Sequence, residues 1–222
     1  MTEPRARFTD QVVIVTGAGN GLGLAYARGF AAEVDVADED SVAAMVQSAE
    51  SAFGGVDVLV NNAGLHLGKY NECTSLPAAD WRRIFDVNVL GAVLCARECR
   101  AALAARGGGV ILNQASVAAW SNGAGAYGAT KLALTSVTMS LATEFAADGI
   151  RVIAIAPGAF MSEAVQAGLL PEQRDLVLAG QLTSELGVPD DLVPTVLFLC
   201  SREARFANAA TFTFDAGFTK RI

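Results

Sequence analysis

The chain has 222 residues, a length that suits one domain with a sizeable hydrophobic core. It is rich in apolar residues and glycine and poor in aromatic residues, which is typical of a parallel sheet covered by helices. The net charge of −7, without any block of lysine or arginine, argues against nucleic acid or a membrane surface as a partner.

The sequence also limits the cellular compartment and the chemistry. No apolar run is long enough to cross a bilayer, and no apolar stretch of a signal peptide follows the N-terminal residues. The four cysteines lack metal-ligand spacing, so we expect buried free thiols, no metal and a cytoplasmic location. His66 is the only histidine, which excludes a histidine-based triad and leaves acid–base chemistry to other residue types.

The first expected element is a strand that leads through a glycine turn into a helix. The residues Val12–Val15 are β-branched and predict a fully buried strand, and apolar residues recur at helical spacing from Leu22 to Phe30. Between them the sequence reads Thr-Gly-x-x-x-Gly-x-Gly, from residue 16 to residue 23. Bare backbone and the free N–H groups of the first helical turn can bind a pyrophosphate, so this arrangement predicts a dinucleotide site.

The connection after this helix is unusual. Helical residues up to Glu33 run directly into Val34–Asp38, whose alternating pattern predicts a strand, and no turn residue separates them. A βα unit of roughly 30 residues is expected at this point of such a fold. Either the sequence joins two pieces of a longer chain, or the chain lacks the unit and Val34–Ala37 pairs beside the first strand. We favour the first explanation and predict a break or strained connection within Ala31–Asp35.

The rest of the chain alternates strands and helices. We expect helices at 41–53 (capped by Asp40 or Ser41), 79–105, 127–147 and 189–199, and strands at 56–60, 110–113, 150–156 and 211–215. This alternation predicts an α/β fold: a doubly wound parallel sheet (Rossmann fold), apparently without one βα unit near Glu33 and Val34. The ligand of such a sheet lies at the carboxyl ends of its strands.

Two residues at the start of the third of these later helices suggest proton transfer. Tyr127 and Lys131 lie four residues apart, which places both side chains on one helix face. A phenol with a pKa of ~10 is a poor base at neutral pH, but an adjacent ammonium and a nicotinamide cation lower that pKa. The alternative is that Tyr127 and Lys131 lie on a solvated helix face without a role in catalysis. The glycine turn earlier in the chain favours the catalytic interpretation.

Together these motifs resemble those of the short-chain dehydrogenases/reductases, from about Gln11 to Thr219. The motifs that appear in the family's order are Thr16-Gly-x-x-x-Gly-Leu-Gly23, Asn61-Asn-Ala-Gly64, Asn88, Ser116, Tyr127-x-x-x-Lys131 and Pro157-Gly158. The resemblance implies a single NAD(P)-binding Rossmann domain over residues 1–222, with a segment at about 159–187 that covers the substrate. It also implies an alcohol dehydrogenase or ketoreductase that interconverts a secondary alcohol and a ketone by hydride transfer.

The resemblance implies a role for each catalytic candidate. Tyr127 exchanges a proton with the substrate oxygen, Lys131 lowers the pKa of that phenol and holds the nicotinamide ribose, and Ser116 hydrogen-bonds the same oxygen. Asn88 holds a water that relays protons, although a kinked helix beside Gly91 is the alternative explanation for an asparagine there. Ser116 precedes Tyr127 by eleven positions, about two fewer than is common in the family.

The resemblance also implies the cofactor site. Its residues are Gly17, Asn20, Gly21, Leu22, Gly23, Asp35, Val36, Asn62, Ala63, Gly64, Tyr127, Lys131, Pro157, Gly158, Phe160 and Ser162, with Asp35 and Val36 at the adenine. The acidic residue that selects NAD would end the second strand of the fold, which is not identifiable here. Asn20 is uncharged where relatives that prefer the phosphorylated cofactor often carry a basic residue, so we favour NAD over NADP.

The substrate and the assembly are less defined. Trp120, Phe160, Met161 and the leucines between 165 and 182 suggest an apolar pocket, and hence an apolar alcohol or ketone. The resemblance implies a homodimer or homotetramer. One rival is a dinucleotide-binding protein with a structural or regulatory role and no turnover. Another is an isomerase or dehydratase on the same scaffold.

Overall fold

The computed structural model describes residues 8, 10–27, 34–66, 68–162, 165 and 171–219. Within this part of the chain, five parallel strands form one sheet in the order β1-β2-β3-β4-β5. Their bounds are β1 Val13–Val15, β2 Val58–Asn61, β3 Gly109–Gln114, β4 Ile150–Pro157 and β5 Thr211–Phe214. All carboxyl ends therefore meet at one edge of the sheet.

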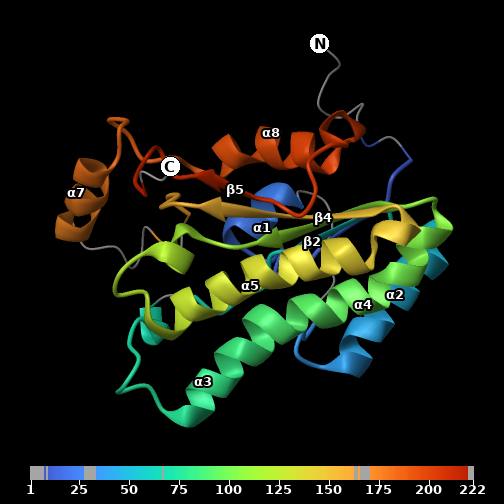
Figure 1. Cartoon of the computed structure of the whole chain (residues 1–222), viewed down its shortest axis with the longest axis horizontal. Helices are drawn as coiled ribbons and strands as arrows, with labels where there is room; N and C mark the ends of the chain where they lie inside the picture. The colour runs from blue at the N-terminus through green and yellow to red at the C-terminus, as the bar shows by residue number, and fades with distance from the viewer. Residues whose placement is uncertain are drawn as a thin grey trace.

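Helices cover both faces of this sheet (Figure 1). One face carries α2 Glu39–Phe53, α4 Gly91–Ala105 and α5 Gly125–Glu144, and the other carries α1 Gly21–Tyr26 and α8 Pro189–Cys200. The remaining helical elements are η2 Gly68–Tyr70, α3 Ala78–Phe85, η3 Asp86–Leu90, η4 Val117–Trp120, η5 Ala146–Asp148, α7 Pro171–Gly180 and η6 Arg202–Ala204. Because both faces are covered, β2 is buried along its whole length. The predicted α/β Rossmann class is confirmed.

The region after α1 differs from the prediction. Val34–Asp38 forms a turn and not a strand, since the Asp35 carboxylate accepts a hydrogen bond from Ala37 N and the Asp35 carbonyl accepts one from Asp38 N. The predicted break or strain at Ala31–Asp35 and the continuation of the first helix to Phe30 fall mainly on residues 28–33, outside the described residues. Strand β1 pairs only with β2 in the described part, so it is half-buried and not fully buried as predicted.

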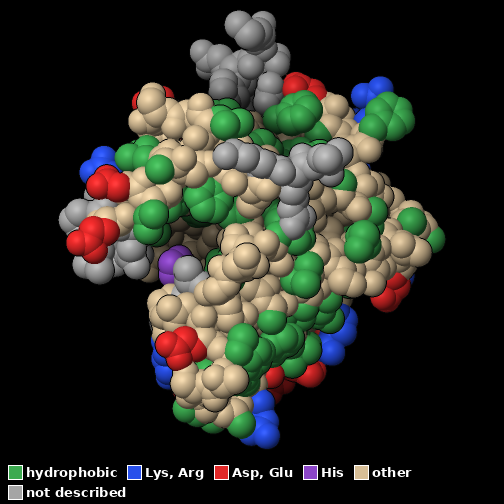
Figure 2. All heavy atoms as spheres, turned by 60° about the vertical axis from the view of Figure 1, so that its left-hand side comes forward, with side chains coloured by type: hydrophobic (Ala, Val, Ile, Leu, Met, Phe, Trp, Pro, Cys, Tyr) green, Lys and Arg blue, Asp and Glu red, His purple; other side chains and the backbone are tan. Residues whose placement is uncertain are grey.

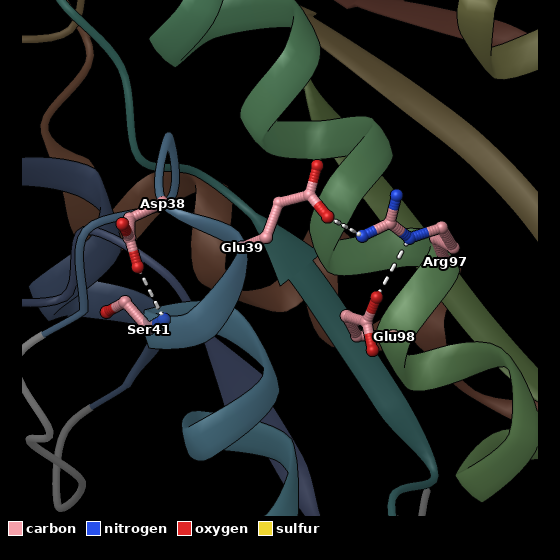
Figure 3. A network of polar contacts seen from close by, with 5 residues as sticks. All are labelled: Asp38, Glu39, Ser41, Arg97 and Glu98. Carbon is pink, nitrogen blue, oxygen red and sulfur yellow. Dashed lines mark hydrogen bonds and ion pairs between the residues drawn. The ribbon is translucent and has the colours of Figure 1, made fainter.

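The turn is fixed to α2 and α4. Asp38 caps α2, because its carboxylate accepts a hydrogen bond from Ser41 N at 2.7 Å, so the predicted caps Asp40 and Ser41 are wrong. Figure 3 shows this cap beside the ion pairs of Arg97 with Glu39 and Glu98, both at 2.8 Å. These pairs are exposed and contribute little to stability. Val36 packs closely against Gly91 of α4. A Cβ added at Gly91 would lie only 2.8 Å from Val36 Cγ2.

Two other predictions concern the cysteines and the membrane. Cys95, Cys99 and Cys200 are buried free thiols, as predicted, but Cys73 is exposed. Burial raises the pKa of the Cys95 thiol to about 12, which makes it a poor nucleophile. Among the described residues, no helix is long and apolar enough to span a membrane.

A buried polar network joins the middle of the sheet to two helices. The fully buried Asn113 of β3 accepts a hydrogen bond from Asn61 Nδ2 at 2.9 Å and donates one to Thr138 Oγ1 at 2.9 Å. Asn61 Nδ2 also donates to the carbonyl of Ala92 in α4 at 3.1 Å. The network therefore fixes β2 and β3 relative to α4 and α5, the elements that carry most of the site described below.

We predict that Asn113→Leu lowers the free energy of unfolding by about 2–3 kcal/mol, because it removes the two buried hydrogen bonds that the Asn113 side chain forms with Asn61 and Thr138. Urea unfolding followed by circular dichroism measures this change. Gln47→Leu is the matched control, since Gln47 is exposed on α2 and its replacement should leave the midpoint unchanged. Equal midpoints for the two variants would contradict the prediction.

Candidate functional site

A cavity of about 790 Å³ opens at the carboxyl ends of β1, β2, β3 and β4. Figure 2 shows the face on which the molecule is hollowed, with the single histidine of the chain at the wall of the hollow. The described residues that line it come from the glycine turn, the ends of the strands, the start of α5 and the segment around α7. This is the edge where the sequence places a ligand.

The glycine turn is packed so closely that side chains are excluded. A Cβ at Gly23 would lie 2.3 Å from Asn62 Nδ2 and 2.4 Å from the carbonyl oxygen of Gly17. Gly17 and Gly21 have φ angles of 65° and 55°, which favour glycine. The turn leads into the first turn of α1, whose N–H groups face an approaching anion. The residues present therefore fit the pyrophosphate of a dinucleotide.

Asn62 holds this turn against the end of β2. Its Nδ2 donates hydrogen bonds to the carbonyls of Thr16 at 3.0 Å and Gly17 at 3.1 Å. In return, Thr16 Oγ1 accepts hydrogen bonds from the backbone N–H groups of Asn62 at 3.1 Å and Ala63 at 3.0 Å. The ends of β1 and β2 thus form one rigid unit beside the cavity.

Ser116, Tyr127 and Lys131 meet at the cavity wall. The Ser116 side chain lies close enough to the Tyr127 hydroxyl to oppose the rise in its pKa that burial causes, despite the short spacing between the two residues. Lys131 Nζ lies 5.6 Å from the centroid of the Tyr127 ring and donates a hydrogen bond of 2.6 Å to the carbonyl of Gln114. All three side chains line the same cavity.

Burial perturbs both ionisable groups. Burial lowers the pKa of Lys131 to about 8, because removal from water disfavours the charged ammonium. Burial also raises the pKa of Tyr127, an effect that the hydrogen bond from Ser116 opposes. The free chain therefore holds a neutral phenol next to a weakly basic amine, and added positive charge would shift the phenol towards its anion.

Asn88 lies next to this group but outside the cavity lining. It sits in η3, a π-helical turn inside the long helix predicted at 79–105, and is buried. Its Oδ1 accepts a hydrogen bond from Leu65 N at 2.7 Å, and its Nδ2 donates to the Leu65 carbonyl at 3.0 Å and to Thr130 Oγ1 at 3.1 Å. Such π-turns are frequent at functional sites. Here the turn links α4, α5 and the loop after β2.

Most of the predicted cofactor residues line the cavity. Those that do are Gly17, Asn20, Gly21, Leu22, Gly23, Asn62, Ala63, Gly64, Tyr127, Lys131, Pro157, Gly158, Phe160 and Ser162. Asp35 and Val36 do not belong to this lining, and Val36 is buried against Gly91.

The apolar part of the lining agrees with the prediction at Phe160, which lines the cavity. Trp120 packs on a cluster of buried alanines and Met161 is outside the lining, whereas Val165, Val177 and Phe218 belong to it. The prediction missed several polar residues of the lining, among them Gln114, Ser121 and Asn122. His66 lines the cavity next to Tyr127, and Gln181 lines it at the end of α7. The only available signal for His66 was its place two residues after Gly64.

Comparison with known proteins identifies the family. A family model described as enoyl-(acyl carrier protein) reductase matches residues 17–219. An uncharacterized oxidoreductase of Mycobacterium tuberculosis is 36% identical, with 95% of this chain and 98% of that protein covered. The chain belongs to the short-chain dehydrogenase/reductase family.

Other members of the family resemble the chain over nearly its whole length. Cis-4-hydroxycyclohexanecarboxylate dehydrogenase of Sinomonas cyclohexanicum is 34% identical, with 96% of this chain and 98% of that protein covered. A solved structure of 7α-hydroxysteroid dehydrogenase with NADH and 7-oxo glycochenodeoxycholic acid superposes with a TM-score of 0.90. Its sequence is 28% identical, and 98% of each chain is covered. The chain is thus an oxidoreductase of this family.

The comparison also bears on the unusual connection after α1. The alignment with the mycobacterial relative is 245 residues long and covers 95% of this 222-residue chain, or about 211 residues, so about 34 positions hold no residue of this chain. That number matches one βα unit of roughly 30 residues. In the described part, β1 accordingly has β2 as its only neighbour.

The lowered pKa of Lys131 predicts a pH-dependent stability. Between pH 8 and ~10.4, the unfolded chain binds a proton at this lysine that the folded chain has lost, so folding stability gains from rising pH. Lys131→Met removes this gain. The free energy of unfolding of the wild type, relative to the variant, should rise by up to about 3 kcal/mol from pH 7 to pH 10.5.

Urea unfolding at several pH values measures this relative stability. Lys69→Met is the matched control, because Lys69 is exposed and its pKa is raised by its hydrogen bond to Asp80. The free energy of unfolding of the wild type, relative to this variant, should not rise over the same range, because a raised pKa makes stability fall with rising pH. A constant difference between wild type and Lys131→Met would show that the ammonium is not destabilised by burial.

Proposed function

We propose that the chain is an NAD(P)-dependent oxidoreductase that interconverts a secondary alcohol and a ketone. The observation that carries the proposal is that Ser116, Tyr127 and Lys131 line one cavity together with a glycine turn that fits a pyrophosphate. Relatives with alcohol-oxidising names, such as meso-2,3-butanediol dehydrogenase of Serratia marcescens at 31% identity, support it.

Each side chain has a defined task in this proposal. Tyr127 Oη takes the proton of the substrate hydroxyl in the oxidation and returns it to the carbonyl oxygen in the reduction. Ser116 hydrogen-bonds the same oxygen and stabilises the charge that develops on it. Lys131 supplies the positive charge that favours the phenolate. The nicotinamide of the bound cofactor supplies or accepts the hydride.

Asn88 is proposed as a positioning residue. Its side chain fixes the backbone of Leu65 and contacts Thr130, one residue before Lys131. The loop after β2 lies close to the lysine, since a Cβ added at Gly64 would be only 3.6 Å from Lys131 Nζ. A shift of this loop would therefore also displace the ammonium of Lys131. The proposed proton path therefore runs from Tyr127 past Lys131 towards a water beside Asn88.

The cofactor is proposed to be NAD in preference to NADP. The described lining includes one lysine, Lys131, and no arginine, and Lys131 lies next to Tyr127, which the proposal places at the nicotinamide end. Asn20, at the entrance to α1, is uncharged and would not attract the extra phosphate of NADP. The neighbour whose structure contains NADH supports the same choice.

The substrate is proposed to have an apolar carbon skeleton. The side chains of Phe160, Val165, Val177 and Phe218 give part of the cavity lining an apolar surface. The segment at about 159–187 is proposed to cover the substrate. A cytoplasmic location is proposed from the buried free thiols.

The assembly is proposed to be a homodimer or homotetramer. Leu90, Leu132 and Met139 are about half exposed on the outer side of η3 and α5 and offer an apolar contact surface. Size-exclusion chromatography with light scattering should give a mass of two or four chains. A monomer at micromolar concentration would refute this part of the proposal.

We predict that Tyr127→Phe lowers kcat by about 10²–10⁴-fold, since general acid–base catalysis contributes this much. Binding of NAD and NADP, titrated separately by fluorescence, should remain within about twofold of wild type because the glycine turn is untouched. Tyr70→Phe is the matched control: it makes the same change in a buried side chain outside the cavity lining and should retain full activity.

The same experiment separates the rival functions. Nucleotide binding without turnover of any secondary alcohol or ketone would favour the structural or regulatory role. Turnover of a substrate without net oxidation or reduction of the cofactor would favour an isomerase or dehydratase. An enoyl thioester belongs in the panel because of the description of the matching family model. Retained alcohol oxidation by Tyr127→Phe would overturn the proposed mechanism.

A further inference from the structure

His66 is a polar side chain at the reaction centre to which the proposed proton transfer gives no task. It lines the cavity, and its ring centroid lies 5.8 Å from that of Tyr127, with 40° between the ring planes. We propose that His66 binds a second, uncharged oxygen of the substrate, close to the carbon that reacts. The site would then prefer vicinal diols and α-hydroxy ketones to simple secondary alcohols. This inference rests on the function proposed above.

The position of His66 is fixed by its backbone. Leu65, the preceding residue, has both its N–H and its carbonyl hydrogen-bonded to the side chain of the buried Asn88. Asn88 in turn contacts Thr130 on α5, and Thr130 Oγ1 donates a hydrogen bond of 2.7 Å to the carbonyl of Tyr127. The histidine and the tyrosine are therefore positioned by one hydrogen-bonded group, which suits two contacts to one small molecule.

The charge state of His66 selects the kind of partner. Partial burial lowers the pKa of the imidazole, and the nearby charge of Lys131 lowers it further. At neutral pH the ring is therefore uncharged, with one nitrogen that donates a hydrogen bond and one that accepts. The ionisable groups that face it are Tyr127 and Lys131.

This chemistry suits a hydroxyl or a carbonyl oxygen. A carboxylate would be bound better by a protonated imidazole, which the lowered pKa disfavours. An ammonium would need a carboxylate, and the described part of the lining contains neither aspartate nor glutamate. Since the reacting oxygen contacts Tyr127 Oη, an oxygen bound by the neighbouring histidine must be attached close to the reacting carbon.

The imidazole also has no internal partner to lose. In the described part of the chain, no hydrogen bond involves either of its nitrogens, so a ligand oxygen would add a bond without breaking one. The lining supplies a further uncharged polar group, Gln181, whose Oε1 is buried and unpartnered. The backbone next to Gln181 is held in place because Leu182 N donates a hydrogen bond of 2.7 Å to the carbonyl of Ala216. His66 and Gln181 thus both favour an oxygenated substrate.

The test compares cyclohexane-1,2-diol with cyclohexanol, two substrates with the same ring that differ in one hydroxyl. We expect the wild type to oxidise the diol with a kcat/KM about tenfold higher, the effect of one net hydrogen bond of ~1.4 kcal/mol. His66→Phe keeps an aromatic ring beside Tyr127 but removes both nitrogens. It should raise KM for the diol about tenfold and leave cyclohexanol unchanged.

A conservative variant and a binding measurement separate recognition from packing. The side chain of asparagine also donates and accepts a hydrogen bond, so His66→Asn should recover part of the preference for the diol. Isothermal titration of the diol into the enzyme with reduced cofactor should show the same order: wild type, His66→Asn, His66→Phe. This readout does not depend on turnover.

Several results would overturn the inference. Equal kcat/KM values for the two alcohols in the wild type would do so, as would an equal loss for both alcohols in His66→Phe. In both cases alcohol oxidation itself would stand. If neither alcohol nor any ketone in a wider panel is turned over, the proposed function fails, and the preference for a second oxygen fails with it.

Discussion

The structure depends on the hydrogen-bonded contact between the ends of β1 and β2. Strand β1 has three residues and, in the described part, one neighbouring strand, so its ladder alone holds it weakly. The amide of Asn62 and the hydroxyl of Thr16 add four hydrogen bonds across this contact. They fix the glycine turn on one side and the loop from Ala63 to His66 on the other. Both walls of the cavity therefore begin at this contact.

The second constraint is the π-helical turn around Asn88. An ordinary α-helical turn would continue the helix ladder, whereas the π-turn directs the buried Asn88 side chain towards the loop after β2. There it satisfies both backbone groups of Leu65 and bonds Thr130 on α5. A core helix thus sets the distance between His66 and Tyr127. The geometry of this part of the cavity is a consequence of core packing.

The sequence predicts features that depend on local geometry and misses those that depend on distant contacts. Tyr127 and Lys131 share a helix face because of helical periodicity alone, and their place in the cavity was predictable. The alternating pattern at Val34–Asp38 favoured a strand, but hydrogen bonds of the Asp35 carboxylate and carbonyl form a turn there. No periodic pattern in the sequence predicts the place of His66. Its position depends on hydrogen bonds between the neighbouring Leu65 and Asn88, which lies 22 residues after His66 in the chain.

The described cavity contains only part of the cofactor site that the resemblance implies. The glycine turn, Lys131 and the residues that follow β4, which the proposal places at the pyrophosphate and the nicotinamide, belong to its lining. The region that the resemblance assigns to the adenine is different. Val36 is buried against Gly91, and the Asp35 carboxylate accepts a hydrogen bond from its own turn. Because these groups already have partners, the proposed function implies that binding energy in the described part comes mainly from the half of the cofactor that reacts. In that proposal Tyr127 and the substrate contact the same half, so cofactor binding and catalysis would rely on the same rigid strand ends.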